Sequence, residues 1–170
     1  MKNTLLCVFV IMLVSCFALP YLNAEEEKAT ETKDHGKQPW IVDIEKLTLE
    51  NQTFRTTVWT GKKLQLTVMV IPPKGEIGLE VHPEGDQFIR VESGIGRIVM
   101  GAAQDTLTFD KQVSHDWAIL IPAGQWHNVI NTGDKPLKIY VLYAPPEHAA
   151  GTVHKTYKES EADHHHHHHH

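Results

Sequence analysis

From residue 38 onward, short apolar segments alternate with clusters of turn-forming residues. Residues 64–71 are dense in leucine, valine and isoleucine, and the run stops at two prolines, a lysine and a glycine. The other segments of this kind are residues 77–82, 87–92, 97–100, 106–109, 117–121, 126–131 and 137–143. Many short segments at turn-bounded intervals, with no convincing amphipathic helix among them, predict an all-β sandwich or barrel. Residues 131–134 are expected to form a hairpin-like turn, and Pro145-Pro146 is expected to end the sheet region.

Residues 1–24 have the pattern of a secretory signal. A cationic start precedes an apolar run, residues 5–14, that is too short to span a bilayer. Cleavage after Ala24 fits the small-residue rule at the last position. Alternatively, the residues before Cys16 have the pattern of a bacterial lipoprotein box, which would lipidate Cys16 and give the chain its one link to a membrane. Either route predicts an exported protein, followed by a polar, flexible linker over residues 25–37.

Both cysteines, Cys7 and Cys16, lie inside this signal. We therefore expect no disulfide, thiolate metal site or cysteine nucleophile in the mature fold. The formal net charge is −5 and no basic cluster occurs, which argues against nucleic acid as a partner. Residues 38–146 are enough for one hydrophobic core, so a single barrel domain is expected there.

The C-terminal part of the chain is polar. Residues 147–163 are interpreted as an extension of the domain, and residues 164–170 are all histidine. A purification tag is the simplest interpretation of this tail, and a native metal-scavenging tail is the alternative. The tail supplies more than half of the 13 histidines, so the histidine count by itself is no evidence for a site.

Glu80 and His82 are the first residues along the chain that could bind a metal or take part in catalysis. They are two positions apart in segment 77–82, so a strand would project both side chains from one face, together with Gly78. The opposite face of this strand would carry Ile77, Leu79 and Val81.

The same alternation applies to two later strands. It places Gln87 on one face with Ile89 and Val91, and it places His127 on one face with Val129. A polar head beside apolar neighbours, repeated on several strands, is typical of a barrel mouth that binds a ligand. Two imidazoles, a carboxylate and an amide are donor types that bind divalent metals.

Two stretches of the chain are similar to known motifs. Residues 75–94 read GEIGLEVHPEGDQFIRVESG, and residues 116–131 read DWAILIPAGQWHNVIN. They resemble the two motifs of the cupin superfamily, Gly-x5-His-x-His-x3,4-Glu-x6-Gly and Gly-x5-Pro-x-Gly-x2-His-x3-Asn. The resemblance covers about residues 63–143. It implies a double-stranded β-helix, the cupin jelly-roll barrel, of the compact bacterial single-domain type.

The chain departs from the family pattern at several positions. Glu80 stands where the family has its first histidine, Gln87 where it has glutamate, and Asp116 where the second motif begins with glycine. The first spacing is also one residue short if Gly75 is its start. Carried over position by position, the resemblance implies a metal shell of Glu80, His82, Gln87 and His127. This inventory is close to that of cupin-type phosphomannose isomerases with the glutamine and glutamate positions exchanged. Asp86 would replace Gln87 if the turn shifted by one residue.

The resemblance implies one divalent metal, with zinc, manganese, iron and nickel all open. In an enzyme, the metal would act as a Lewis acid on a small polar or sugar-like molecule, in isomerase- or dioxygenase-like chemistry. Glu80 would then be the catalytic residue that moves a proton, provided that the metal does not hold it. The alternative is a non-catalytic cupin that binds a metal or a small ligand, and a metal-free structural cupin is a distant third.

The remaining polar and aromatic residues have simpler interpretations. His115, His148 and His154 are expected to be surface or structural residues. Arg90 has the opposite strand parity to Gln87 and is expected outside the cavity, and Trp126 is expected to pack at the barrel rim. Apolar outward residues, Leu79, Val81 and Phe88, predict a homodimer.

Overall fold

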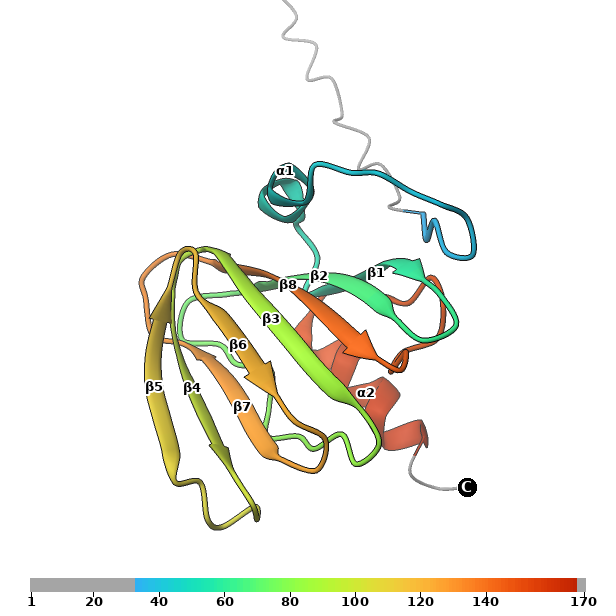
Figure 1. The fold of residues 1–170 in the computed structure, drawn as a ribbon. Coiled ribbons are helices and arrows are strands. Elements are labelled where there is room, and N and C mark those ends of the chain that lie inside the picture. Colours follow the sequence, from blue (N-terminus) through green and yellow to red (C-terminus); the bar gives the residue numbers. More distant parts are fainter. Residues whose placement is uncertain (1–32, 168–170) are drawn as a thin grey trace, which may run out of the picture. The chain divides into compact units, whose positions relative to one another are not determined.

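The computed structural model describes the backbone of residues 33–167 and the side chains of residues 33–163. Two antiparallel sheets form the fold (Figure 1). The six-stranded sheet has the order β6-β3-β8-β2-β1-β9 and the three-stranded sheet the order β5-β4-β7. The strands are β1 (Arg55–Thr60), β2 (Gln65–Ile71), β3 (Asp86–Ser93), β4 (Ile95–Gly101), β5 (Phe109–Ser114), β6 (Ala118–Ile121), β7 (Trp126–Asn131), β8 (Leu137–Ala144) and β9 (Val153–His154). The predicted all-β fold is confirmed.

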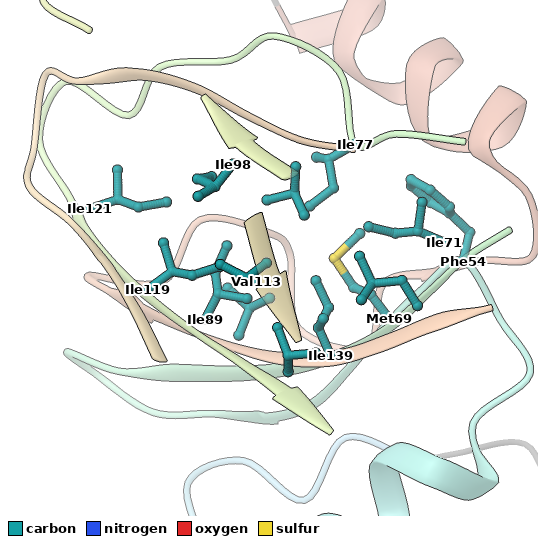
Figure 2. Packing of buried hydrophobic residues seen from close by; sticks show 14 of the residues in the cluster. Phe54, Met69, Ile71, Ile77, Ile89, Ile98, Val113, Ile119, Ile121 and Ile139 are labelled. Carbon is teal, nitrogen blue, oxygen red and sulfur yellow. The ribbon is translucent and has the colours of Figure 1, made fainter. Parts of the chain in front are cut away.

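The hydrophobic core lies between the two sheets (Figure 2). Gln87, Ile89 and Val91 of β3 are at most 3% exposed, which confirms the predicted inward parity of that strand. On β7, His127 and Val129 are at most 1% exposed, so the prediction for the second strand is also confirmed. Each large aliphatic side chain in this core contributes roughly 1.5–3 kcal/mol through its burial. Gln87 and His127, the polar residues on these inner faces, are therefore surrounded by closely packed apolar side chains.

Residues 77–82 differ from the expected strand. They contain one isolated bridge, Glu80 with His127, and a second, Glu76 with Ile130, directly precedes them. Gly78 adopts a φ of 105°, a conformation that breaks the two-residue alternation. As a result, Ile77 is buried in the core, although strict alternation placed it on the face opposite Glu80.

The prediction of a hairpin-like turn at residues 131–134 is also wrong, because the two strands that the turn connects do not pair with each other. β7 and β8 lie in different sheets, so the turn is a corner between sheets rather than a hairpin. Asn131 fixes this corner, because its side-chain Nδ2 donates to the carbonyl oxygens of Ile71 and Lys135, each at 2.8 Å. Its Oδ1 accepts from the Gly133 amide at 2.9 Å.

Two helices and two strands lie outside the segments that the sequence pattern predicted. Helix α1 (Ile44–Glu50) begins at Asp43, whose side chain accepts from the Lys46 amide at 3.1 Å. Strand β9 pairs with β1, so the six-stranded sheet continues beyond Pro145-Pro146, where the sequence pattern ended it. Helix α2 (Tyr157–His167) follows β9. Strand β1 itself had no counterpart among the predicted segments.

The signal, the possible lipid anchor at Cys16 and most of the linker lie outside the described residues, as do the side chains of the histidine tail. Within residues 33–167, neither helix is long and apolar enough to cross a membrane.

Candidate metal centre

Glu80, His82 and His127, here called the Glu80 cluster, come together from two neighbouring backbone segments. Glu80 and His127 are bridge partners, because each amide donates to the other residue's carbonyl oxygen at 3.0 and 2.9 Å. His82 is held two residues further on, where its carbonyl oxygen accepts from the Gly124 amide at 2.9 Å. Gly124 has a φ of 79°, which a glycine adopts without strain.

The side chains of the Glu80 cluster converge on one point. The Glu80 Oε1 lies 3.4 Å from the Nε2 of His82 and 3.4 Å from the Nε2 of His127. The two imidazole centroids are 5.3 Å apart. All three ligand atoms fall within 4.8 Å of one another, a spacing that suits donors around a single ion.

A partner on the far side of each ring fixes which imidazole nitrogen faces the cluster. The Nδ1 of His127 donates to the Gln125 carbonyl oxygen at 2.8 Å. The Nδ1 of His82 lies 3.3 Å from a carboxylate oxygen of Glu147. Metal-binding histidines commonly have such partners, which set the tautomer and leave the Nε2 lone pair for the ion.

Three donor atoms of the Glu80 cluster have no hydrogen-bond partner outside the cluster. The Glu80 Oε1, the His82 Nε2 and the His127 Nε2 are all buried, and their polar neighbours among the described residues are one another, at 3.4 Å. Buried polar atoms are nearly always paired, so three such atoms at one point indicate that something else binds them. A carboxylate and two neutral imidazoles are the donor set of many Zn, Fe, Mn and Ni sites, so these residues fit a divalent metal.

The charges of the Glu80 cluster are strongly coupled. Burial opposes ionisation of Glu80, but its contacts with His127 and His82 and the charge of Arg55 outweigh burial and hold the pKa of Glu80 below its ordinary value. Burial likewise lowers the pKa of His82, but Glu147 and Glu80 outweigh it and raise the pKa to about 9. Without a metal, His82 therefore carries a proton at neutral pH, and a metal that binds its Nε2 must displace that proton.

Gln87, the fourth ligand implied by the motif, lies on the inner face of β3. Its cross-strand partner is Tyr143 of β8, and the side-chain oxygen and nitrogen of its amide are both buried and unsatisfied. The amide lies beside the Tyr143 hydroxyl on the inner face, and ligation by Gln87 stays a prediction. Asp86 takes another role, because its Oδ1 accepts from the Ala123 amide at 2.9 Å on the exposed side.

Comparison with known proteins places these features in a family. The family model described as a cupin domain matches residues 67–143, the part of the chain that contains both motifs. The chain is 50% identical to the uncharacterized protein YrkC of Bacillus subtilis over 137 residues, which is 81% of this chain and 74% of that protein. The chain belongs to the cupin superfamily. The predicted double-stranded β-helix is thereby confirmed.

Solved structures agree with this assignment. This cupin is 54% identical in sequence to BH2720 from Bacillus halodurans, with a TM-score of 0.76 over 76% of this chain and 98% of that chain. A conserved protein with a double-stranded β-helix domain from Klebsiella pneumoniae has a TM-score of 0.53 at 20% identity, over 70% of this chain and 100% of that chain. The second likeness concerns the fold alone.

Another group of this cupin brings three donor side chains together within 4.8 Å, namely Glu45, Glu92 and His115. Two of these side chains are exposed, and the buried Glu92 carboxylate already faces Arg90 at 3.8 Å. Arg90 also pairs with Asp116 outside the barrel, as its strand parity predicted. This second group therefore lacks the unsatisfied atoms that distinguish the Glu80 cluster.

The other histidines and Trp126 occupy varied places. His115 is exposed beside Asp116, and His154 of β9 is buried with its Nε2 3.2 Å from Asp163. The ring of His148 packs edge-on against Tyr143, with centroids 5.1 Å apart. Trp126 is half-buried at the start of β7.

Three residues near the Glu80 cluster were missed by sequence reasoning. Glu147 follows the two prolines at the end of β8, in a segment that carries no motif. Tyr143 has the inward parity of β8, and its hydroxyl is buried without a partner. Arg55 lies on β1, a strand that the pattern did not predict. Only Tyr143 had a usable signal, the parity of its strand.

Proposed function

We propose that this protein is a metal-binding cupin in which Glu80, His82 and His127 hold one divalent metal, with Gln87 as the fourth donor. The observation that carries the proposal is the convergence of three buried donor atoms that have no hydrogen-bond partner outside the Glu80 cluster. The metal would be zinc, manganese, iron or nickel, since imidazole and carboxylate donors suit these ions and the described fold offers no thiolate.

The favoured role is that of an enzyme acting on a small polar molecule, in isomerase- or dioxygenase-like chemistry. A metal on this donor set would act as a Lewis acid that polarises a substrate oxygen. Three protein ligands leave a position open for that oxygen, and ligation by Gln87 would narrow the opening. Glu147 and the Gln125 carbonyl would keep the imidazoles oriented during turnover.

The protonation states of Tyr143 and Glu80 decide which of them could donate a proton to a substrate and which could accept one. Burial raises the pKa of Tyr143, so its hydroxyl keeps its proton and is available as a donor. Glu80 is ionised and would accept a proton only in a state in which the metal does not hold it.

The alternative is a non-catalytic module that binds a metal or a small ligand. It is favoured by the burial of His82 and His127, which are 7% and 1% exposed. A module of this kind would have a closed shell, whereas an enzyme would retain an exchangeable position on the metal. Export and homodimer formation stay predictions from the sequence in either case.

The test is cobalt substitution in a full-length chain whose tail histidines, residues 164–170, are replaced by glutamine. One equivalent of Co²⁺ should produce a d–d absorption band that changes when azide is added, as expected for an open coordination position. His82→Ala should abolish the band, while the control His115→Ala, at an exposed histidine, should leave it unchanged.

A band that ignores azide would favour the closed module over the enzyme. The absence of any band in the parent chain, or a band that survives in His82→Ala, would rule out the proposed metal centre.

A further inference from the structure

Arg55 is a buried cation without an anionic partner. Its side chain is 1% exposed, and it is among the largest fully buried side chains of the fold. Its Nη1 donates to the Ser160 hydroxyl of α2, and its Nε has no hydrogen-bond partner. Among residues 33–163, no carboxylate forms an ion pair with this guanidinium, in contrast to Arg90 and Arg97. A guanidinium in this position is costly to bury unless an anion accompanies it.

The strand register places Arg55 on the inner face of the larger sheet. Arg55 is the cross-strand partner of Met69, and Met69 is the partner of Ile139; both partners belong to the core. Residues paired directly across antiparallel strands project to the same face, so Arg55 faces the barrel interior. The Glu80 cluster belongs to the same interior, because Glu80 is the bridge partner of His127, which lies on the inner face of β7 with the core residue Val129.

Further unsatisfied polar groups lie on this inner face. Thr67 is two residues from Met69 on β2, and its hydroxyl is buried without a partner. The Tyr143 hydroxyl and the Gln87 amide are unsatisfied as well. The interior therefore offers a cation and several neutral groups, in addition to the donor atoms that the metal would use.

Glu80 is one candidate for a counter-ion, but its carboxylate contacts both imidazoles. The Oε1 atom lies 3.4 Å from each Nε2, and a bound metal would take up the same oxygen. In the metal-loaded protein the buried charges would be those of the divalent metal, the Glu80 carboxylate and the Arg55 guanidinium. Their sum is positive, and it stays positive when the exposed Glu147 carboxylate beside His82 is included. A ligand with a negative charge would balance it.

We propose that Arg55 is the anion-binding group of this interior and receives the carboxylate of a small organic acid lying beside the Glu80 cluster. The inference rests on the proposed function and narrows its substrate class to small carboxylic acids. The planar guanidinium suits a carboxylate, and the free Nε–H supplies a charge-assisted hydrogen bond. A single cation among neutral hydroxyls suits a monoanion better than a dianionic phosphate.

The test is calorimetric titration of the full chain, again with glutamine at residues 164–170, with glycolate and with its uncharged analogue glycolamide. Each titration is done with and without one equivalent of Co²⁺, in a buffer free of carboxylates. The parent should bind glycolate at least tenfold more tightly than glycolamide. Arg55→Met should lose about tenfold or more in glycolate affinity, while the matched control Arg90→Met should keep the parent value.

A Ser160→Ala variant tests whether Arg55 binds glycolate or only holds helix α2 in place through Ser160. It removes the one hydrogen-bond partner that residues 33–163 give the Arg55 guanidinium but keeps the cation, so glycolate binding should persist even if the protein melts at a lower temperature. Should Arg55→Met fail to fold, the comparison of glycolate with glycolamide in the parent still decides.

Equal affinity for glycolate and glycolamide in the parent, or unchanged glycolate affinity in folded Arg55→Met, would overturn the carboxylate inference. Tighter binding of inorganic phosphate than of glycolate would also overturn it. The cobalt band reports the metal centre independently, so a normal band without glycolate binding sinks this inference and leaves the proposed function standing. Glycolate binding that depends on Arg55 but occurs without a cobalt band would rule out the metal centre and support Arg55 as the carboxylate-binding group.

Discussion

Each imidazole of the Glu80 cluster is held at its Nδ1 by a different kind of partner. A backbone carbonyl, that of Gln125, orients His127, while a carboxylate, that of Glu147, orients His82. The carbonyl is fixed by the backbone at the start of β7, whereas Glu147 is a side chain that one substitution can change. His82 is therefore the member of the cluster whose orientation is open to a direct test.

Glu147→Gln should weaken metal binding by about tenfold or more, because the amide keeps the shape but loses the charge that orients the His82 ring and makes it more basic. Competition with a chromophoric chelator measures the change. Glu50→Gln, which removes a carboxylate paired with Lys46 on the surface of α1, is the matched control and should have no effect. Equal metal affinity in Glu147→Gln and the parent would show that Glu147 does not support the site.

At the scale of elements, the segment that carries Glu80 and His82 depends on one glycine. Gly78 has a φ of 105°, and a Cβ at this position would lie 3.3 Å from the Tyr157 hydroxyl of α2. Gly78→Ala should therefore destabilise the protein by about 1–3 kcal/mol. Urea denaturation measures the loss.

Gly85→Ala is the control for this substitution, because Gly85 lacks a positive φ and its nearest atom would lie 3.5 Å away. A Gly78→Ala variant as stable as Gly85→Ala would mean that the segment does not need the left-handed conformation.

The β9–α2 region gives the protein a specific sensitivity to acid. Burial and the nearby charge of Arg55 lower the pKa of His154, against the opposing effects of Asp163 and Glu159. The unfolded chain therefore binds a proton at His154 near pH 6.5, whereas the folded chain does so only at lower pH. This group consequently makes the folded state lose stability as the pH falls below about 6.5.

His154→Gln should remove that part of the pH dependence. The free energy of unfolding, measured in urea at pH 8 and at pH 5.5, should fall less between the two pH values in the variant than in the parent. If the parent and His154→Gln lose the same stability on acidification, His154 is not buried in its neutral form.

The elements also show what the sequence could and could not predict. The inward positions of Gln87 and His127 were predictable, because both lie on regular strands where alternation holds. The irregular path of residues 77–82 was not, because the positive φ of Gly78 interrupts the strand and no neighbouring residue signals it. Arg55 and Glu147 lie outside both motifs. Arg55 reaches the interior only through the long-range pairing of β1, and the exposed Glu147 reaches His82 only through the path of the chain after β8.

At the scale of the whole molecule, the core between the two sheets carries the stability on which the site depends. Ile139 lies in β8, between β2 and β3, and is fully buried (Figure 2). Ile139→Ala should cost about 2–5 kcal/mol through lost burial and the cavity that it leaves. Leu120→Ala, at a position that is 71% exposed, should change stability by no more than about 0.5 kcal/mol.

Denaturant midpoints compare the two variants directly. Similar losses in both would mean that the outer face of the six-stranded sheet is covered in solution, an outcome that the predicted homodimer would produce.

The central claim is that the Glu80 cluster holds one divalent metal, and elemental analysis of the purified protein tests it most directly. The full chain with glutamine at residues 164–170 is compared with the same chain carrying His82→Ala and His127→Ala. We predict about one equivalent of zinc, manganese, iron or nickel in the first protein and none in the second. No metal in either protein after reconstitution, or equal metal in both, would contradict the account.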